Sequence, residues 1–547
     1  MAKKIEPHQA ESTVGYFQLC SAILCVLLVA TLARNIDRPF TGLHSWGEAA
    51  TAWRARTFLK YELSYTKGAA VWAVGDPPSS NPNRALDHPQ LGLFLPAFDM
   101  LIFGQDEAGL RTGGIIRAVI ALLIFLLIAK GLLGKETALL AGLFYVLFPI
   151  TGYFGCGVPL ISNYDFLLGL VALWNYLVIT EAVKSGPQPA KRHRWLLAAS
   201  LFFAIQTSWC GFFYAAAICI HYIFSCVRRR RMPEKKLMAI LLLAPGSSLA
   251  LNFMVMAAGH GWDWQKIWQL YTWRAGKGEM AAFRWGPWFA KMREYAVLNF
   301  TLPVLVIAGA YLIVGQLLSL CKDGSAATAT PVKRFPQFWL LLMPGVLQMF
   351  VFKGSLWWHQ FWQMPLIPFM AIAAALGAAW IAGMFAGIHR RAATAAFAGL
   401  LTLITVSCVK GVNYYYSIVD FPAAKAAMFK DLNSRIPPNE ALLSYESFVR
   451  SQHPVKGPHV RPEVAWYLDR RIVQARSWEE IQRYAAGDCR YYLIPAVGRL
   501  SKLVNRLERT YRPEYIPAVA PTKTEDGRRL NIGMPPYMIF DLKSSRQ

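Results

Sequence analysis

The chain has 547 residues, of which 55% are hydrophobic and only 16% charged, whereas a soluble domain carries about a quarter charged residues. This composition excludes an ordinary soluble protein. The formal net charge of +25 comes largely from basic residues in short segments between apolar runs, which argues against nucleic-acid binding and is typical of the positive-inside pattern of membrane proteins.

Apolar stretches of about 18 or more residues recur along the chain, and each is long enough to cross about 30 Å of hydrocarbon as a helix. Backbone groups in lipid must be hydrogen-bonded within their own segment, so helices are expected. Placing the N-terminus in the cytoplasm makes every basic cluster cytoplasmic. The sequence therefore predicts about eleven transmembrane helices, at residues 16–34, 114–133, 137–154, 159–181, 195–211, 212–227, 236–258, 298–320, 337–353, 364–387 and 392–412.

Two long hydrophilic excursions interrupt this series, at about 35–113 and 259–297, and the helix count places both outside the cytoplasm. We assign residues 1–416 to a transmembrane domain that includes these outer loops. No small-residue cleavage signal follows the first apolar run, so we expect that run to stay in the protein as the first helix.

Residues 417–547 differ in kind from the rest of the chain. Short apolar runs at 442–445 and 491–494 indicate strands, and Ser477 is typical of a helix N-cap. Strands that alternate with helical patterns predict a small soluble α/β domain. The helix count places this domain outside the cytoplasm.

The first outer loop contains most of the acidic side chains that call for an explanation. Asp37, Glu48 and Asp87 are the candidate catalytic carboxylates. Residues 49–57 look like an amphipathic helix lying at the membrane surface, and Glu48 near its start is explained either by the helix dipole or by a general-base role toward an acceptor hydroxyl.

Candidate substrate-binding residues accompany these carboxylates in the same loop. His44 precedes Glu48 by four residues, so the two could share a helix face or bind a divalent metal ion together. Two ligands are too few to establish a metal site, so no cofactor is assigned. Trp46 and His88 are further candidates for binding the substrate.

Arg111 and Arg117 lie close to or inside the second predicted helix, where an arginine is costly unless it reaches the interface or pairs with an anion. A lipid phosphate is one candidate partner, and Asp106 or Glu107 is the other. Asp165 near the start of the fourth predicted helix is expected to face a cavity or a basic partner.

Tryptophans and cations gather in the second outer loop and again at residues 357–362. An aromatic belt with interfacial cations explains this pattern. A binding wall for a sugar or a lipid headgroup explains it as well, because cations bind phosphate. Lys353 and His359 are the binding candidates from the later segment.

Several short patterns occur in an order that resembles a known family, the membrane glycosyltransferases with the C-type fold. The similarity is to the branch of the dolichyl-phosphate-mannose protein mannosyltransferases and the lipid A aminoarabinose transferases, over residues 15–412. Gly47 stands where that family usually carries an aspartate. The matching patterns are Gly47-Glu48-Ala49-Ala50 with Ala55-Arg56, His88-Pro89-Gln90-Leu91, Gly104 to Arg111 with Glu107, Asp165, and His359 with Pro365 and Pro368.

The resemblance implies inverting transfer of a monosaccharide from a polyprenyl-phosphate donor to a lipid, glycan or protein acceptor on the outer face of the membrane. Glu48 would activate the acceptor, with Asp37 or Asp87 as substitutes. Arg111, Lys353 and His359 would bind the phosphate of the leaving group. Membrane lipids are the other partners, and a bacterial inner membrane is the expected location.

Two other classes of function stay open at this point. A flippase or transporter of lipid-linked saccharides would need polar residues along the middle of several helices, whereas here they concentrate at the outer ends. A non-catalytic membrane scaffold is the other alternative, and Gly47 keeps it open.

Overall fold

A computed structural model describes residues 8–76, 83–86, 88–157, 160–180, 190–260, 264–277, 284–315, 335–453, 457–487, 489–496, 500–518 and 534–545. The chain forms two compact units. One comprises Met1–Ile36, Arg111–Ala257 and Asp263–Tyr414, and the other comprises Asp37–Leu110, Ala258–Trp262 and Tyr415–Gln547. The predicted domain boundary at residue 416 stays a prediction; the compact units group residues 37–110 with the C-terminal residues.

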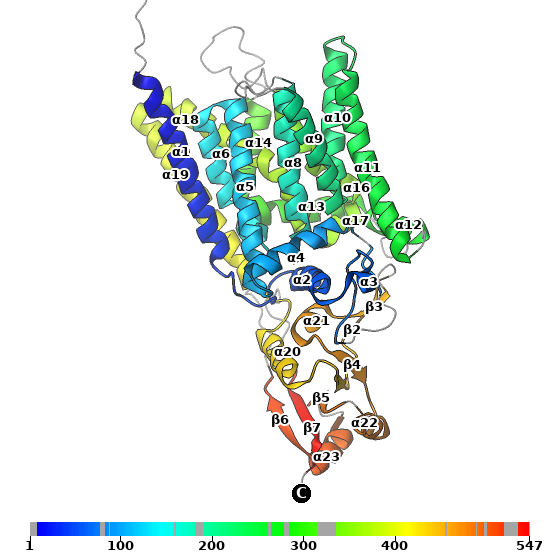
Figure 1. Cartoon of the computed structure of the whole chain (residues 1–547). Helices are drawn as coiled ribbons and strands as arrows, with labels where there is room; N and C mark the ends of the chain where they lie inside the picture. The colour runs from blue at the N-terminus through cyan, green and yellow to red at the C-terminus, as the bar shows by residue number, and fades with distance from the viewer. Residues whose placement is uncertain are drawn as a thin grey trace, which may run out of the picture. The chain divides into compact units, whose positions relative to one another are not determined.

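The first unit consists of helices that lie side by side in Figure 1. Within the described residues, six helices are long and apolar enough to span a membrane, or seven if one bent pair counts as a single span. The prediction of a helical membrane protein is confirmed, and the count of eleven is not. The helices are α1 (His8–Ala33), α5 (Glu107–Leu133), α6 (Lys135–Leu147), α7 (Pro149–Phe154), α8 (Leu160–Ile179), α9 (Ala190–Thr207), α10 (Gly211–Arg228), α11 (Lys235–His260), α12 (Trp264–Arg274), α13 (Trp285–Phe300), α14 (Leu302–Ala310), η1 (Tyr311–Gly315), α16 (Phe335–Val351), α17 (Lys353–Trp358), η3 (Gln360–Leu366), α18 (Ile367–Ala386) and α19 (Arg390–Ser417).

Two predicted helices are interrupted in the structure. The helix predicted at 137–154 ends at Leu147 and restarts at Pro149, because proline favours an extended residue before it and is well placed in a first helical turn. The helix predicted at 298–320 is wrong in its first residues, since α13 and α14 meet there at 102°. Thr301 between them has φ 67°, in the left-handed region.

Gly114 in α5 allows a close approach of another segment of this unit. A Cβ on Gly114 of α5 would lie 2.2 Å from the carbonyl oxygen of Cys156, a distance that no side chain tolerates. Gly114 therefore lets the segment after α7 lie directly on α5, one turn before Arg117.

The second unit contains a five-stranded sheet of order β4-β1-β5-β7-β6. Strands β4, β1 and β5 are parallel, whereas β7 is antiparallel to both β5 and β6. The two strands predicted at 442–445 and 491–494 are confirmed, and so is the mixed α/β character of this region. The strands are β1 (Ala441–Ser444), β2 (Val449–His453), β3 (Gly457–Val460), β4 (Arg471–Gln474), β5 (Tyr491–Pro495), β6 (Tyr511–Ile516) and β7 (Tyr537–Ser545), with β2 and β3 forming a separate hairpin.

Helices α22 (Trp478–Ala485) and α23 (Ser501–Thr510) lie beside this sheet in Figure 1 and bury Trp478, Ile481 and Leu507 in its core. Ser477 caps α22 as predicted. Its hydroxyl accepts from the backbone N–H of Glu480, whose carboxylate accepts from the Ser477 N–H, so the two residues form a capping box.

The remaining helices of this unit are α2 (Ser45–Lys60), α3 (Leu63–Thr66), α4 (Leu91–Phe103), α20 (Ala423–Arg435) and α21 (Pro462–Leu468). Helix α2 contacts α4 and α21. The predicted helix near 49–57 is confirmed, but its amphipathic character is wrong, because every residue from Glu48 to Ala55 is buried. Alanines at 49, 50, 52 and 55 explain this burial, since small side chains let neighbouring elements approach closely from several directions.

Candidate functional site

Glu48 lies in the first turn of α2 and is only 7% exposed. A carboxylate is favoured at this position by the partial positive charge of the helix N-terminus. The side chain is nevertheless removed from bulk water, which an ordinary helix-stabilising glutamate does not require. The helix-dipole explanation fits this position, and the general-base role of Glu48 stays a prediction.

The helix that carries Glu48 begins with an unusual residue. His44, the N-cap of α2, has φ 61° and ψ 26°, in the left-handed region that a residue with a side chain rarely adopts. Its side chain makes no capping hydrogen bond. Instead, its backbone N–H donates to Asp420 Oδ2 at 2.6 Å. The candidate binding residue His44 is therefore buried at the start of α2, with its ring edge toward Trp46 at 6.3 Å between ring centroids.

The next residue is bound by a second carboxylate from the C-terminal part of the chain. Ser45 Oγ donates to Glu463 Oε1 at 2.9 Å, and Arg461 Nε donates to Glu463 Oε2 at 3.2 Å. Glu463 is completely buried. Burial raises the pKa of Asp420, the His44 N–H acts in the opposite direction, and the nearby charge of Glu463 raises this pKa further.

A phenol lies near the same end of α2. Tyr467 accepts a hydrogen bond from the Phe40 N–H at 2.6 Å and donates to Glu107 Oε1 at 2.7 Å. Burial raises the pKa of Tyr467, and the negative charges of Glu107 and Glu48 raise it further. Tyr467 thus donates to one buried carboxylate, Glu107, and feels the negative charge of a second, Glu48.

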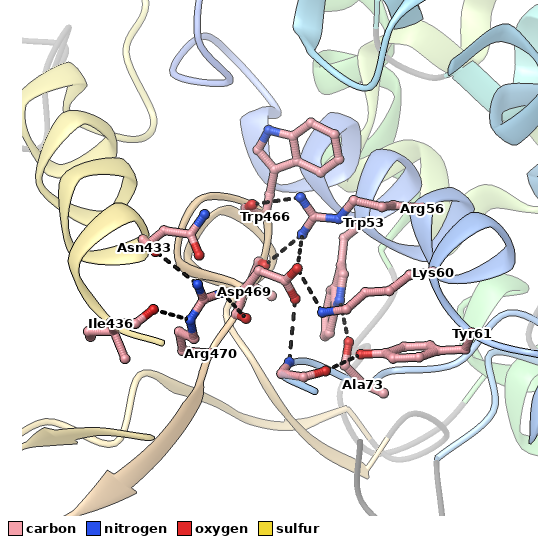
Figure 2. A network of polar contacts seen from close by, with 12 residues as sticks. Trp53, Arg56, Lys60, Tyr61, Ala73, Asn433, Ile436, Trp466, Asp469 and Arg470 are labelled. Carbon is pink, nitrogen blue, oxygen red and sulfur yellow. Dashed lines mark hydrogen bonds and ion pairs between the residues drawn. The ribbon is translucent and has the colours of Figure 1, made fainter. Parts of the chain in front are cut away.

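The other end of α2 is bound by a different carboxylate, Asp469, which Figure 2 shows between Arg56 and Lys60. Lys60 Nζ lies 2.9 Å from Asp469 Oδ2 and Arg56 Nη2 lies 3.6 Å from it. Arg56 also donates to the carbonyls of Ala465 and Trp466 and lies 4.4 Å over the Trp466 ring. Burial lowers the pKa of Arg56, against the effect of Asp469.

The candidate residues of the membrane unit occupy three separate places. Arg117 lies in α5 with its guanidinium 3.8 Å from the centre of the Tyr164 ring, and it lines a cavity together with Thr151 and Asn163. The oxygens Thr151 Oγ1 and Asn163 Oδ1 are buried without a hydrogen-bond partner. Polar groups of this kind need a donor such as water.

Arg111 and Asp165 have polar neighbours of their own. Arg111 Nη1 donates to the backbone carbonyls of Asn35 and Ile36, at 3.2 and 3.1 Å. These carbonyls are partners that the sequence did not indicate. Asp165 is buried in α8 and has the Ser208 hydroxyl as a hydrogen-bond partner. The expected basic partner of Asp165 stays a prediction.

Lys353 and His359 stand at the two ends of one short helix, α17. Lys353 Nζ lies 4.7 Å over the ring of Trp285, and the Lys353 carbonyl accepts from the indole N–H of Trp288. His359 stacks on Phe361 with a centroid distance of 5.1 Å. Two tryptophans of the second predicted outer loop therefore contact Lys353, one at its ammonium group and one at its backbone carbonyl, and the two explanations of that loop stay open.

The other candidates are less buried or lie outside the described part of the chain. Asp37 is exposed in the turn after α1, while Trp46 and His88 are half-buried. Asp87 lies outside the described residues. Among the residues that the structure describes, no group of three histidine, cysteine, aspartate or glutamate side chains could hold a metal ion.

Comparison with known proteins identifies the fold. Residues 87–248 match the family model described as dolichyl-phosphate-mannose-protein mannosyltransferase. The structure is similar to that of ArnT from Cupriavidus metallidurans bound to undecaprenyl phosphate, with a TM-score of 0.52 and 12% identity over 96% of this chain and 98% of that one. The chain has the C-type fold of the membrane glycosyltransferases.

The same C-type fold is shared with an oligosaccharyltransferase. The apo crystal structure of the enzyme from Archaeoglobus fulgidus aligns with a TM-score of 0.55 and 11% identity, over 94% of this chain and 74% of that chain. The archaeal enzyme AglB from Archaeoglobus fulgidus, in complex with an inhibitory peptide and a dolichol-phosphate, gives 0.52 and 10% identity, over 94% and 74%. No curated protein sequence matches the chain.

These findings confirm the resemblance drawn from the sequence and indicate a membrane glycosyltransferase. The family match begins at residue 87, so it contains His88, Arg111, Arg117 and Asp165 but not Glu48. The evidence for a role of Glu48 therefore comes from the geometry of α2 and not from the family match.

The sequence did not indicate four polar residues that the structure brings near the start of α2. They are Asp420, Arg461, Glu463 and Tyr467. Glu463 follows Pro462 at the beginning of α21, where an acidic residue has an ordinary explanation in the helix dipole. The sequence indicates Glu107 as part of a motif, but not as the hydrogen-bond acceptor of Tyr467. The contacts of Asp420 with His44, of Glu463 with Ser45 and of Tyr467 with Glu107 join residues hundreds of positions apart, which no local pattern reveals.

Proposed function

We propose that this chain transfers a monosaccharide from a polyprenyl-phosphate donor to an acceptor hydroxyl on the extracytoplasmic face of the membrane, with inversion at the anomeric carbon. The fold and the family match support a membrane glycosyltransferase. The lipids in the structures of ArnT and AglB are polyprenyl phosphates by their descriptions, which supports a donor of this chemical class.

The observation that carries the proposal is the buried carboxylate of Glu48 in the first turn of α2, whose charge also acts on the buried phenol of Tyr467. A general base has to take up a proton from the acceptor as the new bond forms. Of the three catalytic candidates, Glu48 fits this task best, because Asp37 is exposed to water and Asp87 lies outside the described residues.

The chemical step is a single displacement. The acceptor oxygen forms a bond to the anomeric carbon while the bond from that carbon to the phosphate oxygen breaks, and Glu48 takes the acceptor proton. Polyprenyl phosphate leaves with the bonding electron pair. Its negative charge needs cations, so we assign phosphate binding to Arg111, Arg117, Lys353 and His359, since positioning and charge stabilisation supply much of the catalysis in such reactions.

His44, Trp46, His88 and Asp165 are proposed to contact the sugar or the acceptor, which is a lipid, a glycan or a protein. A divalent metal ion is not required by this scheme. The proposed location is a bacterial inner membrane, with the N-terminus in the cytoplasm and residues 417–547 outside it.

The test is release of polyprenyl phosphate by purified full-length protein, supplied with a panel of polyprenyl-phosphate monosaccharides and a crude membrane extract as the source of acceptors. Glu48→Gln keeps the shape of the side chain and removes the base, so release should fall about 10²–10⁴-fold. Glu62→Gln is the matched control, because Glu62 is exposed, and it should release product at the wild-type rate.

Equal release by wild type and Glu48→Gln would keep the transferase and move the base to Asp37 or Asp87. No release from any donor by the wild type would overturn the proposed function and bring the flippase and scaffold alternatives forward. A flipping assay on the same preparation separates those two.

A further inference from the structure

The start of α2 is joined to two carboxylates that the proposed reaction does not use. We propose that Glu463, together with Asp420, is a positioning residue for Glu48: the two carboxylates hold the first turn of α2 in a strained conformation that sets the direction of the Glu48 side chain. The catalytic consequence rests on the proposed function, whereas the structural part does not.

The burial of Glu463 is the first argument. This side chain is 0% exposed, and one of its oxygens binds a neutral hydroxyl, Ser45 Oγ, while the other binds Arg461. A buried carboxylate is costly, and a hydrophobic residue of similar size often stabilises a fold as well or better. A buried carboxylate that accepts from the side chain of the first residue of a helix therefore suggests a geometric role.

The second argument is the conformation that these contacts maintain. His44 has φ 61° without being glycine, which costs energy that the surroundings have to supply. Asp420 binds the His44 N–H at 2.6 Å, and an isolated bridge joins Gly42 to Val419 beside it. Three connections from residues 419–463 thus fix residues 42–45 in this one conformation.

The third argument is the short distance from these contacts to Glu48. Glu48 follows Ser45 by three positions, which is a rise of about 4.5 Å along one face of the helix. A shift at Ser45 therefore moves the Glu48 carboxylate almost equally. A displacement of about 1 Å in a catalytic group can reduce the rate about 10²-fold.

The chain provides a matched comparison on the same short helix. Asp469 lies at the C-terminal end of α21 and binds Arg56 and Lys60, at the far end of α2. Both carboxylates join α21 to α2, but only Glu463 does so beside the catalytic candidate. Asp469→Asn therefore removes a comparable contact without disturbing the first turn, and asparagine tolerates the left-handed conformation that residue 469 adopts.

The experiment measures two quantities on full-length Ser45→Ala, Glu463→Gln and Asp469→Asn proteins: the kcat and KM of polyprenyl phosphate release, and amide hydrogen exchange of peptides covering residues 44–52 and 56–62. Ser45→Ala is expected to lower kcat by about 10-fold or more at nearly unchanged donor KM, with exchange about tenfold faster only in residues 44–52. Glu463→Gln keeps an oxygen that can accept from the Ser45 hydroxyl, so this variant should retain most of the wild-type kcat. Asp469→Asn should change only the exchange of residues 56–62.

Unchanged exchange of residues 44–52 in Ser45→Ala would overturn the inference at any level of activity. Faster exchange there with unchanged kcat would overturn the catalytic part, and faster exchange throughout the C-terminal residues would show a merely structural contact. If the wild type releases no polyprenyl phosphate, the proposed function fails, and the exchange data alone decide whether Glu463 orders the start of α2.

Discussion

The two ends of α2 are bound to the same short helix by carboxylates, yet the chemistry differs. At the N-terminal end, Glu463 is fully buried and accepts from a hydroxyl and a guanidinium. At the C-terminal end, Asp469 is 15% exposed and pairs with Arg56 and Lys60. Ion pairs that water can reach contribute little stability, whereas a buried carboxylate has large costs that its partners must offset. The end of α2 that carries Glu48 therefore has the more buried and more costly contact, as the proposed positioning role requires.

The largest effect is expected from removing the Arg461–Glu463 contact near the N-terminal end of α2. Arg461→Met removes the only cation seen among the described hydrogen bonds of Glu463, so a buried negative charge stays behind. We expect a loss of about 2–3 kcal/mol in stability, somewhat less than the loss of about 3–5 kcal/mol for fully buried pairs because Arg461 is 38% exposed. The midpoint of thermal unfolding in detergent measures this loss, and Arg461→Lys should recover part of it. A midpoint equal to wild type would show that Glu463 is stable without its cation.

The second prediction concerns pH and the same end of α2. Burial raises the folded-state pKa of Asp420 above its ordinary value of 3.8, with Glu463 adding to the shift and the His44 N–H and Arg461 opposing it. A carboxyl group with a raised pKa contributes stability that is fully present below its unfolded-state pKa of 3.8 and is lost as the pH rises through its folded-state pKa. Asp420→Asn should remove this decline from the thermal midpoint, measured from pH 4 upward.

A suitable control for the pH series is Asp431→Asn, which changes a more exposed carboxylate on α20 that pairs with Arg435. This variant should keep the wild-type slope. Equal slopes in the wild type and in Asp420→Asn would contradict the assignment of the pH dependence to Asp420.

The smallest expected effect is at the C-terminal end. Asp469→Asn removes the charge that Arg56 and Lys60 share, but Arg56 keeps its hydrogen bonds to the carbonyls of Ala465 and Trp466. We expect a loss of at most about 1 kcal/mol, which weakens further at high salt. Thermal unfolding at low and high ionic strength measures it. A loss as large as that of Arg461→Met would remove the difference between the two ends.

Some elements of the second unit could be predicted because their causes are local. The capping box of Ser477 and Glu480 involves residues three apart, and the strands at β1 and β5 follow from short apolar runs. Glu48 in a first helical turn belongs to the same group. Neighbouring residues determine these features, so a single sequence reveals them.

Other features had causes far away in the chain. Ser45 and Glu463 are 418 positions apart, and His44 and Asp420 are 376 apart. The burial of residues 48–55 depended on elements that contact α2, such as α4 and α21, which no periodicity within residues 49–57 indicates. The sharp bend at Thr301 interrupted an apolar run that looked like one uninterrupted helix.

The sequence by itself determined that this protein is a helical membrane protein with a small α/β region after residue 417, because apolar run length and local hydrogen-bonding preferences act over a few neighbouring residues. Its motifs also indicated the C-type fold. The groups that gather near the start of α2 depend on the tertiary structure, because a buried polar group is stabilised by whichever partners the fold brings within hydrogen-bond distance. Those groups, Tyr467, Glu107 and the carboxylates that hold Ser45 and His44, come from segments that meet only in the folded chain.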